Sequence, residues 1–249
     1  MNALEENPHT RAWRQLGAAM PRPRAILAVS AHWYTRGTGV TAMEQPRTIH
    51  DFHGFPAALF ERRYPAPGDP ALARRIQELL QPICVGADRE WGLDHGTWSV
   101  LTHVYPQADI PVVQLSIDAT QPPEYHYQMG RRLAPLRDEG VLIFGSGNVV
   151  HNLRQAKWGP AAGAHPWAAA FDSQLRAALA DGDHPSAIHY ERFGEAAALS
   201  IPTPEHYLPL LYVLGAGRAD DAISFPTDGI EMGSISMLTV LMASADGGR

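Results

Sequence analysis

The chain reads Ala25-Ile26-Leu27-Ala28-Val29-Ser30-Ala31-His32 near its start, an apolar run that leads through a serine and an alanine into a histidine. Apolar runs of this length are typical of strands that are covered on both faces of a parallel sheet. The segments 112–117 and 141–145 have the same near-continuous apolar character. We therefore predict that all three runs are buried strands of an α/β fold.

Helical patterns alternate with these runs along the 249 residues, a length that suits one large domain. We expect strands at 25–29, 39–43, 112–117, 141–145, 222–225 and 236–241. We expect helices at 10–20, 70–80, 97–105, 122–139, 166–180 and 204–214, several of which open with a proline that suits the first helical turn. This alternation predicts a single-domain α/β protein with a mostly parallel central sheet flanked by helices.

The composition argues against several classes of protein. The formal net charge is −6 and the sequence has no basic stripe, so we expect no nucleic-acid partner and no anionic membrane partner. No run approaches the ~20 apolar residues that a membrane span needs. The single cysteine, Cys84, excludes an intramolecular disulfide and is typical of a protein of the reducing cytoplasm. Its apolar neighbours, Ile83 and Val85, predict a buried thiol.

Three histidines stand at the ends of predicted elements. His32 follows the first strand, His151 follows the glycine-rich turn after the strand at 141–145, and His206 is expected in the first turn of a helix capped by Thr203. Ligands of open α/β folds collect beyond the carboxyl ends of the strands, and neutral imidazole is the commonest metal ligand. We therefore predict a mononuclear metal site of His32, His151 and His206. Considered singly, each of these histidines is equally well explained as one whose ring is satisfied by local hydrogen bonds.

Further histidines suggest chemistry beside that site. His95 follows Asp94, which we expect to orient or polarise it, and a histidine so placed suits general acid–base catalysis. His50 and His53 lie in an aromatic loop and are predicted to line a pocket for an aromatic substrate. Serine, cysteine and zincin-type hydrolases have no positive motif. We expect the remaining histidines on the surface or on helix faces: His9, His103, His126, His165, His184 and His189.

Seven segments, in order along the chain, resemble the class III extradiol ring-cleavage dioxygenases, and in particular the bacterial and plant branch of DOPA dioxygenases. They are Ser30-Ala31-His32-Trp33, Thr48-Ile49-His50-Asp51-Phe52, Tyr64-Pro65-Ala66-Pro67-Gly68, Gly92-Leu93-Asp94-His95-Gly96, Pro111-Val112-Val113-Gln114-Leu115-Ser116, Gly145-Ser146-Gly147-Asn148-Val149-Val150-His151-Asn152 and Thr203-Pro204-Glu205-His206-Tyr207-Leu208-Pro209.

The resemblance implies an extradiol dioxygenase catalytic domain over residues 1–249 that opens the ring of a catechol, such as DOPA, with O2. It implies a non-haem metal, Fe(II) in the first place and Zn(II) in the second. His32 and His206 would be ligands, His151 a further ligand or an acid–base group, and His95 the catalytic histidine near the substrate hydroxyl.

One departure from the family pattern accompanies the resemblance. Members of this branch begin with a strand that ends in Ser/Gly-His-Gly-Ser-Pro, whose histidine is a metal ligand. The sequence here opens with Met1-Asn2-Ala3-Leu4-Glu5, which resembles the stretch directly after that motif, so we expect it to lack that strand and ligand. Two alternatives stay open: a zinc-dependent hydrolase on the same scaffold, and a shortened relative without catalysis. The sequence leaves the oligomeric state open.

Overall fold

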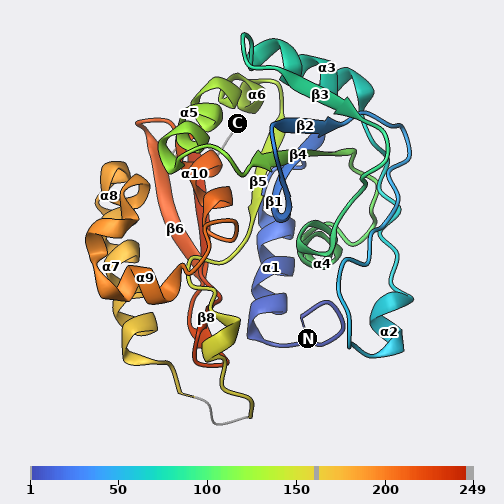
Figure 1. Cartoon of the computed structure of the whole chain (residues 1–249). Coiled ribbons are helices and arrows are strands. Elements are labelled where there is room, and N and C mark those ends of the chain that lie inside the picture. The colour runs from blue at the N-terminus through green and yellow to red at the C-terminus, as the bar shows by residue number, and fades with distance from the viewer. Residues whose placement is uncertain (1, 160–162, 245–249) are drawn as a thin grey trace.

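Strand β1 (Ala25–Thr35) lies inside a five-stranded sheet whose order is β3-β2-β4-β1-β5 (Figure 1). The computed structural model describes residues 2–159 and 163–244. The other strands of this sheet are β2 (Thr38–Thr41), β3 (Val85–Asp88), β4 (Val112–Asp118) and β5 (Val141–Ser146). Strand β1 is parallel to β4 and β5, and β2 is parallel to β3, while β2 meets β4 antiparallel. The predicted mostly parallel sheet is confirmed.

Helices cover both faces of this sheet. Their bounds are α1 (Pro8–Ala19), α2 (Ala57–Phe60), α3 (Pro70–Leu79), α4 (His95–Val104), α5 (Pro123–Leu133), α6 (Pro135–Asp138), α7 (Pro166–Ala180), α8 (His184–Ile188), α9 (Glu195–Ser200) and α10 (Leu208–Gly215). Figure 1 shows α1 and α4 to one side of β1 and β5, with α5, α7, α8, α9 and α10 to the other.

Strand β1 contributes to two cores because successive side chains of a strand point to opposite faces. Ala25, Leu27 and Val29 belong to the core that contains the buried residues of α3, α5, α7 and α10. Ile26 and Ala28 belong to the second core, beneath α1 and α4. Every residue from Ala25 to Ala31 is buried, and so is every residue of β4. This double burial explains the continuous apolar run from which the strand was predicted.

Several predicted elements differ from the observed ones. The helix expected at 122–139 is divided into α5 and α6, because Pro135 has no N–H to continue the hydrogen-bond ladder. The strands expected at 222–225 and 236–241 lie outside the central sheet: β6 (Asp221–Thr227) pairs antiparallel with β9 (Thr239–Ser244). A small hairpin of β7 (Ile230–Glu231) and β8 (Ile235–Ser236) stands between them in the chain.

One burial prediction was wrong. Cys84 is exposed, because it precedes the edge strand β3 and the buried side chain there is Val85. His103 and His126, expected on the surface or on a helix face, lie in α4 and α5, and both side chains are buried. Among the described residues, no helix is long and apolar enough to cross a membrane.

Helices α5 and α10 approach each other closely at two glycines. A Cβ on Gly130 would lie 2.3 Å from the carbonyl oxygen of Tyr212, and a Cβ on Gly215 would lie 2.1 Å from that of Tyr127. These distances are too short for real carbon–oxygen contacts, so each helix needs its glycine where it crosses the backbone of the other.

We expect Gly130→Ala to lower the free energy of unfolding by about 1–3 kcal/mol, because the added methyl forces the two helices apart. Gly86→Ala is the matched control, since a Cβ there meets only the Thr38 carbonyl oxygen at 3.8 Å. Its effect should stay within about 0.5 kcal/mol. Urea unfolding of both variants measures the difference, and equal effects would contradict the close crossing.

Burial also sets the charge of His126. Its Nδ1 lies 3.0 Å from the Tyr212 hydroxyl, and burial lowers its pKa from the ordinary value of 6.5 to about 4. Between these values the unfolded chain binds the proton and the folded chain does not, so this histidine destabilises the fold as the pH falls from 6.5 towards 4.

We expect His126→Gln to be less stable than the wild type at pH 7, and this difference in the free energy of unfolding should shrink in acid. Relative to the wild type, its free energy of unfolding should recover by on the order of 3 kcal/mol between pH 7 and pH 4. Urea unfolding of both proteins at a series of pH values tests this, because the other titrating groups are common to the two chains. A deficit that is independent of pH would show that the His126 pKa is not lowered.

Candidate active site

Four histidine rings form a continuous row beyond the buried part of β1. The ring centroids of His95 and His32 are 3.9 Å apart, and those of His32 and His206 are 5.2 Å apart. His206 then stacks on His151 at 3.5 Å, with 7° between the ring planes. The structure thus brings the three predicted metal ligands and the predicted acid–base histidine into one cluster.

His32 enters this row where β1 becomes irregular. The pairing of β1 with β4 shifts register between Val29 and Tyr34, and such irregularities commonly redirect side chains beside active sites. Ser30 still pairs with Ser146 of β5, so the end of β1 lies next to the turn that leads to His151.

The first turn of α4 packs directly on this end of β1. A Cβ on Gly96 would lie 2.5 Å from the Ser30 hydroxyl oxygen and 2.8 Å from Cδ2 of His32, so only glycine fits there. Its neighbour His95 is the first residue of α4. The Ser146 hydroxyl donates to the Gly96 carbonyl oxygen at 2.6 Å, which ties β5 to the same turn.

Asp94 caps α4 rather than serving the His95 ring. Its fully buried carboxylate accepts hydrogen bonds from the Thr97 backbone N–H at 3.0 Å and from the Ser30 hydroxyl at 2.7 Å. The Gln114 side-chain amide of β4 donates to its other oxygen. The expectation that Asp94 orients His95 is therefore corrected: Asp94 holds the helix start against β1 and β4.

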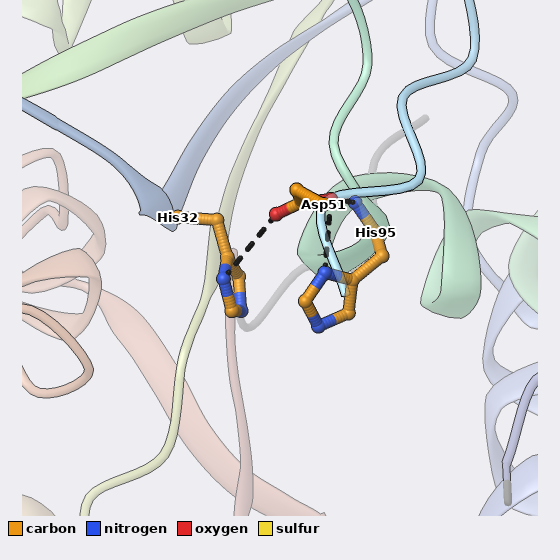
Figure 2. Close-up of side chains that lie close together, drawn as sticks. All are labelled: His32, Asp51 and His95. Atoms are coloured by element: carbon orange, nitrogen blue, oxygen red, sulfur yellow. Dashed lines mark hydrogen bonds and ion pairs between the residues drawn. The ribbon is translucent and has the colours of Figure 1, made fainter. Parts of the chain in front are cut away.

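The carboxylate beside the His95 ring belongs to Asp51, which the sequence did not single out. Its Oδ1 lies 3.0 Å from His95 Nδ1 and accepts the His95 backbone N–H at 2.9 Å. Its Oδ2 lies 3.4 Å from His32 Nδ1 (Figure 2). Burial raises the pKa of the Asp51 carboxyl, but hydrogen bonds from His95 outweigh burial and hold the pKa below its ordinary value. In the sequence, the one sign of this role was the position of the Asp51 carboxylate directly after His50.

His206 lies in the turn before α10, not in its first helical turn as predicted, because α10 begins only at Leu208. The Asn148 backbone N–H donates to the His206 carbonyl oxygen at 2.9 Å, and the Asn148 side-chain oxygen lies 3.3 Å from His206 Nδ1. A Cβ on Gly147 would lie 2.1 Å from that same carbonyl oxygen. The Gly147-Asn148 turn therefore holds His206 in place. The Thr203 hydroxyl donates to Glu205 instead of capping the helix.

Burial favours the neutral form of His32, His151 and His206. It lowers the pKa of His151 to about 4 and that of His206 well below 6.5. Burial and the neighbouring His95 also lower the pKa of His32. The largest cause at His206 is desolvation, followed by the neighbouring histidines. Neutral imidazole is the form that binds a metal ion, so the donor set fits a divalent metal.

The group with metal-binding geometry differs from the predicted ligand set. Among the described residues, ligand atoms of His32, Asp51 and His95 all lie within 4.8 Å of one another. This group shares His32 with the predicted set of His32, His151 and His206. Nitrogen and carboxylate ligands together suit Fe(II) and Zn(II) equally.

An aromatic group lies beside His95. The Phe52 ring meets the His95 ring edge-on, with the ring centroids 5.3 Å apart. The centroids of the Phe52 and Phe60 rings are 4.8 Å apart. His50, predicted to bind substrate, packs against Phe52 at 5.8 Å, and its Nε2 lies 2.9 Å from the Arg62 carbonyl oxygen. His53, predicted likewise, is exposed on the loop. The structure thus places His50 one ring away from the histidine row and His53 at the surface.

Comparisons with known proteins agree with this arrangement. Residues 5–239 match the family described as "Catalytic LigB subunit of aromatic ring-opening dioxygenase". A protein of Escherichia coli K12 named 4,5-DOPA dioxygenase extradiol is 58% identical over 245 residues, covering 96% of this chain and 90% of that protein. A protein of the same name from Beta vulgaris is 46% identical over 199 residues, covering 78% of this chain and 74% of that protein.

A solved structure shows the same fold. The crystal structure of an uncharacterized protein from Escherichia coli K12 superimposes with a TM-score of 0.84 at 53% sequence identity, covering 95% of this chain and 93% of that chain. The family match spans both the sheet and every residue of the histidine row. The chain therefore belongs to the LigB family of aromatic ring-opening dioxygenases.

Proposed function

We propose that this enzyme, an extradiol dioxygenase, acts on DOPA or a closely related catechol. The observation that carries the proposal is the row of four histidine rings in a chain that is 58% identical to a protein named 4,5-DOPA dioxygenase extradiol. Extradiol cleavage adds both atoms of O2 to the catechol. The ring bond that breaks joins one hydroxyl-bearing carbon to the neighbouring carbon that bears no hydroxyl. The family match favours this activity over a zinc-dependent hydrolase and over a relative without catalysis.

We propose His32, His151 and His206 as the residues that hold the metal, with Fe(II) as the working ion and Zn(II) as the second candidate. Their support is the shared cluster and the lowered pKa values, which keep all three rings unprotonated near neutral pH. A divalent metal bound there would supply the positive charge that favours the catecholate and the electronic coupling between catechol and O2.

His95 is the proposed acid–base group. Asp51 faces its Nδ1, which leaves the other ring nitrogen to take a proton from a catechol hydroxyl and to return it later. The Phe52 ring, edge-on against His95, offers an apolar surface to the aromatic substrate. His50 packs against Phe52, and His53 is exposed on the same loop. The single cysteine, Cys84, supports the reducing cytoplasm as the place of action.

Alanine variants separate metal binding from proton transfer. His32→Ala and His206→Ala should lose most of the bound metal, because each removes a ligand. His95→Ala should keep the metal while kcat falls by about 10²–10⁴-fold, the usual contribution of an acid–base group. His189→Ala is the control, since that half-exposed ring pairs with Glu191.

The measurements are metal content after anaerobic reconstitution with Fe(II), then oxygen uptake and visible absorbance with L-DOPA. A yellow ring-opened product with one O2 consumed per DOPA would support the proposed function. Retention of metal by His206→Ala together with its loss from His95→Ala would reverse the two roles. A wild-type protein that holds Fe(II) yet consumes no O2 with any catechol would overturn the proposal.

The two loop histidines should affect substrate binding more than turnover. His50→Ala removes a ring that packs against Phe52, so KM for L-DOPA should rise about 3–10-fold, the worth of one aromatic contact. His53→Ala, on the exposed part of the loop, should raise KM by no more than about twofold. Steady-state oxygen uptake gives both constants. A fall in kcat at constant KM for His50→Ala would place that residue in proton transfer instead.

A further inference from the structure

We propose that Asp51 is a positioning residue that sets the orientation and the tautomer of two histidine rings at once. This inference rests on the proposed function, because it assigns His95 to proton transfer and His32 to the metal. Figure 2 shows the Asp51 carboxylate between the two rings, with one oxygen towards each. Oδ1 lies 3.0 Å from His95 Nδ1 and Oδ2 lies 3.4 Å from His32 Nδ1.

A carboxylate in this position determines where each neutral ring carries its hydrogen. An ionised carboxylate can only accept hydrogen bonds, and a neutral imidazole has one N–H and one lone pair. Both contacts are close approaches rather than aligned hydrogen bonds, and a lone pair at either Nδ1 would face the carboxylate charge. We therefore expect both rings to carry their N–H at Nδ1 and to keep the lone pair on Nε2. His32 then has Nε2 free for a metal, and His95 has Nε2 free to accept a proton. The pairing of a ligating histidine with a carboxylate is a common way to select the tautomer.

Backbone contacts fix Asp51 independently of the rings. The His95 backbone N–H donates to Oδ1 at 2.9 Å, which ties Asp51 to the first residue of α4. The loop that carries Asp51 is itself held by the Ile49 N–H, which donates to the Leu93 carbonyl oxygen at 2.8 Å. These backbone contacts thus define the position of the Asp51 carboxylate whatever the orientation of either ring.

The neighbouring acid, Asp94, does not orient the two rings. Its carboxylate is occupied by Ser30, Thr97 and Gln114, so it holds the start of α4 and leaves the rings to Asp51. A metal-ligand role is the competing assignment for Asp51, since its oxygens also lie within ligand range of His32 and His95. Positioning is favoured because both oxygens already face imidazole Nδ1 atoms and one also accepts a backbone N–H.

The test compares Asp51→Asn with Asp69→Asn. Asparagine keeps the shape of the side chain and one acceptor oxygen for the His95 backbone, but its amide group donates and cannot accept from the second ring. Asp69 is the matched control, because its carboxylate also accepts backbone N–H groups, from Ala71 and Leu72 at the start of α3.

The first readout needs neither metal nor turnover. Two-bond ¹H–¹⁵N correlation spectra of the metal-free protein with ¹⁵N-labelled histidine, recorded at pH 8, report the tautomer of each ring. We expect His32 and His95 to be Nδ1–H tautomers in the wild type and in Asp69→Asn. In Asp51→Asn at least one of the two rings should change its tautomer or populate both.

The second readout is kinetic. Asp51→Asn should bind Fe(II) about 10–100-fold more weakly, because an Nε2–H tautomer of His32 has no lone pair for the metal. At saturating Fe(II) it should keep KM for L-DOPA within about twofold, while kcat falls about 10–100-fold, as for other carboxylates that orient ligating or catalytic histidines. Asp69→Asn should leave all three quantities unchanged.

Each other outcome overturns the inference. Loss of Fe(II) affinity from folded Asp51→Asn with both ring tautomers unchanged would make Asp51 a metal ligand. Unchanged tautomers with unchanged kcat would leave it no role at the rings. An Nε2–H tautomer of His95 in the wild type overturns the inference even if the variant does not fold. Absence of O2 uptake by the wild type would instead defeat the proposed function and leave the tautomer test standing.

Discussion

The site depends on the fully buried carboxylate of Asp94. A buried charge is costly unless hydrogen bonds replace its water, and here Ser30 of β1, the Thr97 backbone of α4 and Gln114 of β4 supply them. The same carboxylate therefore joins two strands to the start of one helix. His32 follows Ser30 by two residues and His95 follows Asp94 directly, so this junction places both rings.

Two glycines let the remaining parts reach the junction. Gly96 allows α4 to contact Ser30 and His32, and Gly147 allows the turn after β5 to contact the His206 backbone. Side chains at either position would separate the histidines, because the contacts involve backbone or short, confined groups. The row of rings is therefore a product of close backbone packing, and the aromatic group at Phe52 closes one end of it.

Electrostatics divides the row into two kinds of histidine. His206 and His151, stacked on each other, owe their low pKa values first to burial. His32 and His95 share a carboxylate, and its pKa is held low by the hydrogen bonds from His95. Neutral rings suit metal binding, whereas a ring paired with a carboxylate suits proton transfer. His32 has both properties and stands where the two halves of the row meet.

The sequence alone determined the strands at 25–29, 112–117 and 141–145 and the histidines that follow them, because apolar runs and strand ends are local features. It also predicted that His32, His151 and His206 belong to one site, a prediction that followed from the edge at which parallel strands end, and the resemblance to the extradiol dioxygenases added His95. Only the tertiary structure decided which carboxylate serves His95. Asp94 is adjacent to His95 in the sequence, but its carboxylate caps α4. The hydrogen bond from the His95 backbone N–H to Asp51 spans 44 positions. No local pattern reveals such a contact, because it arises only when the loop after β2 packs against the start of α4.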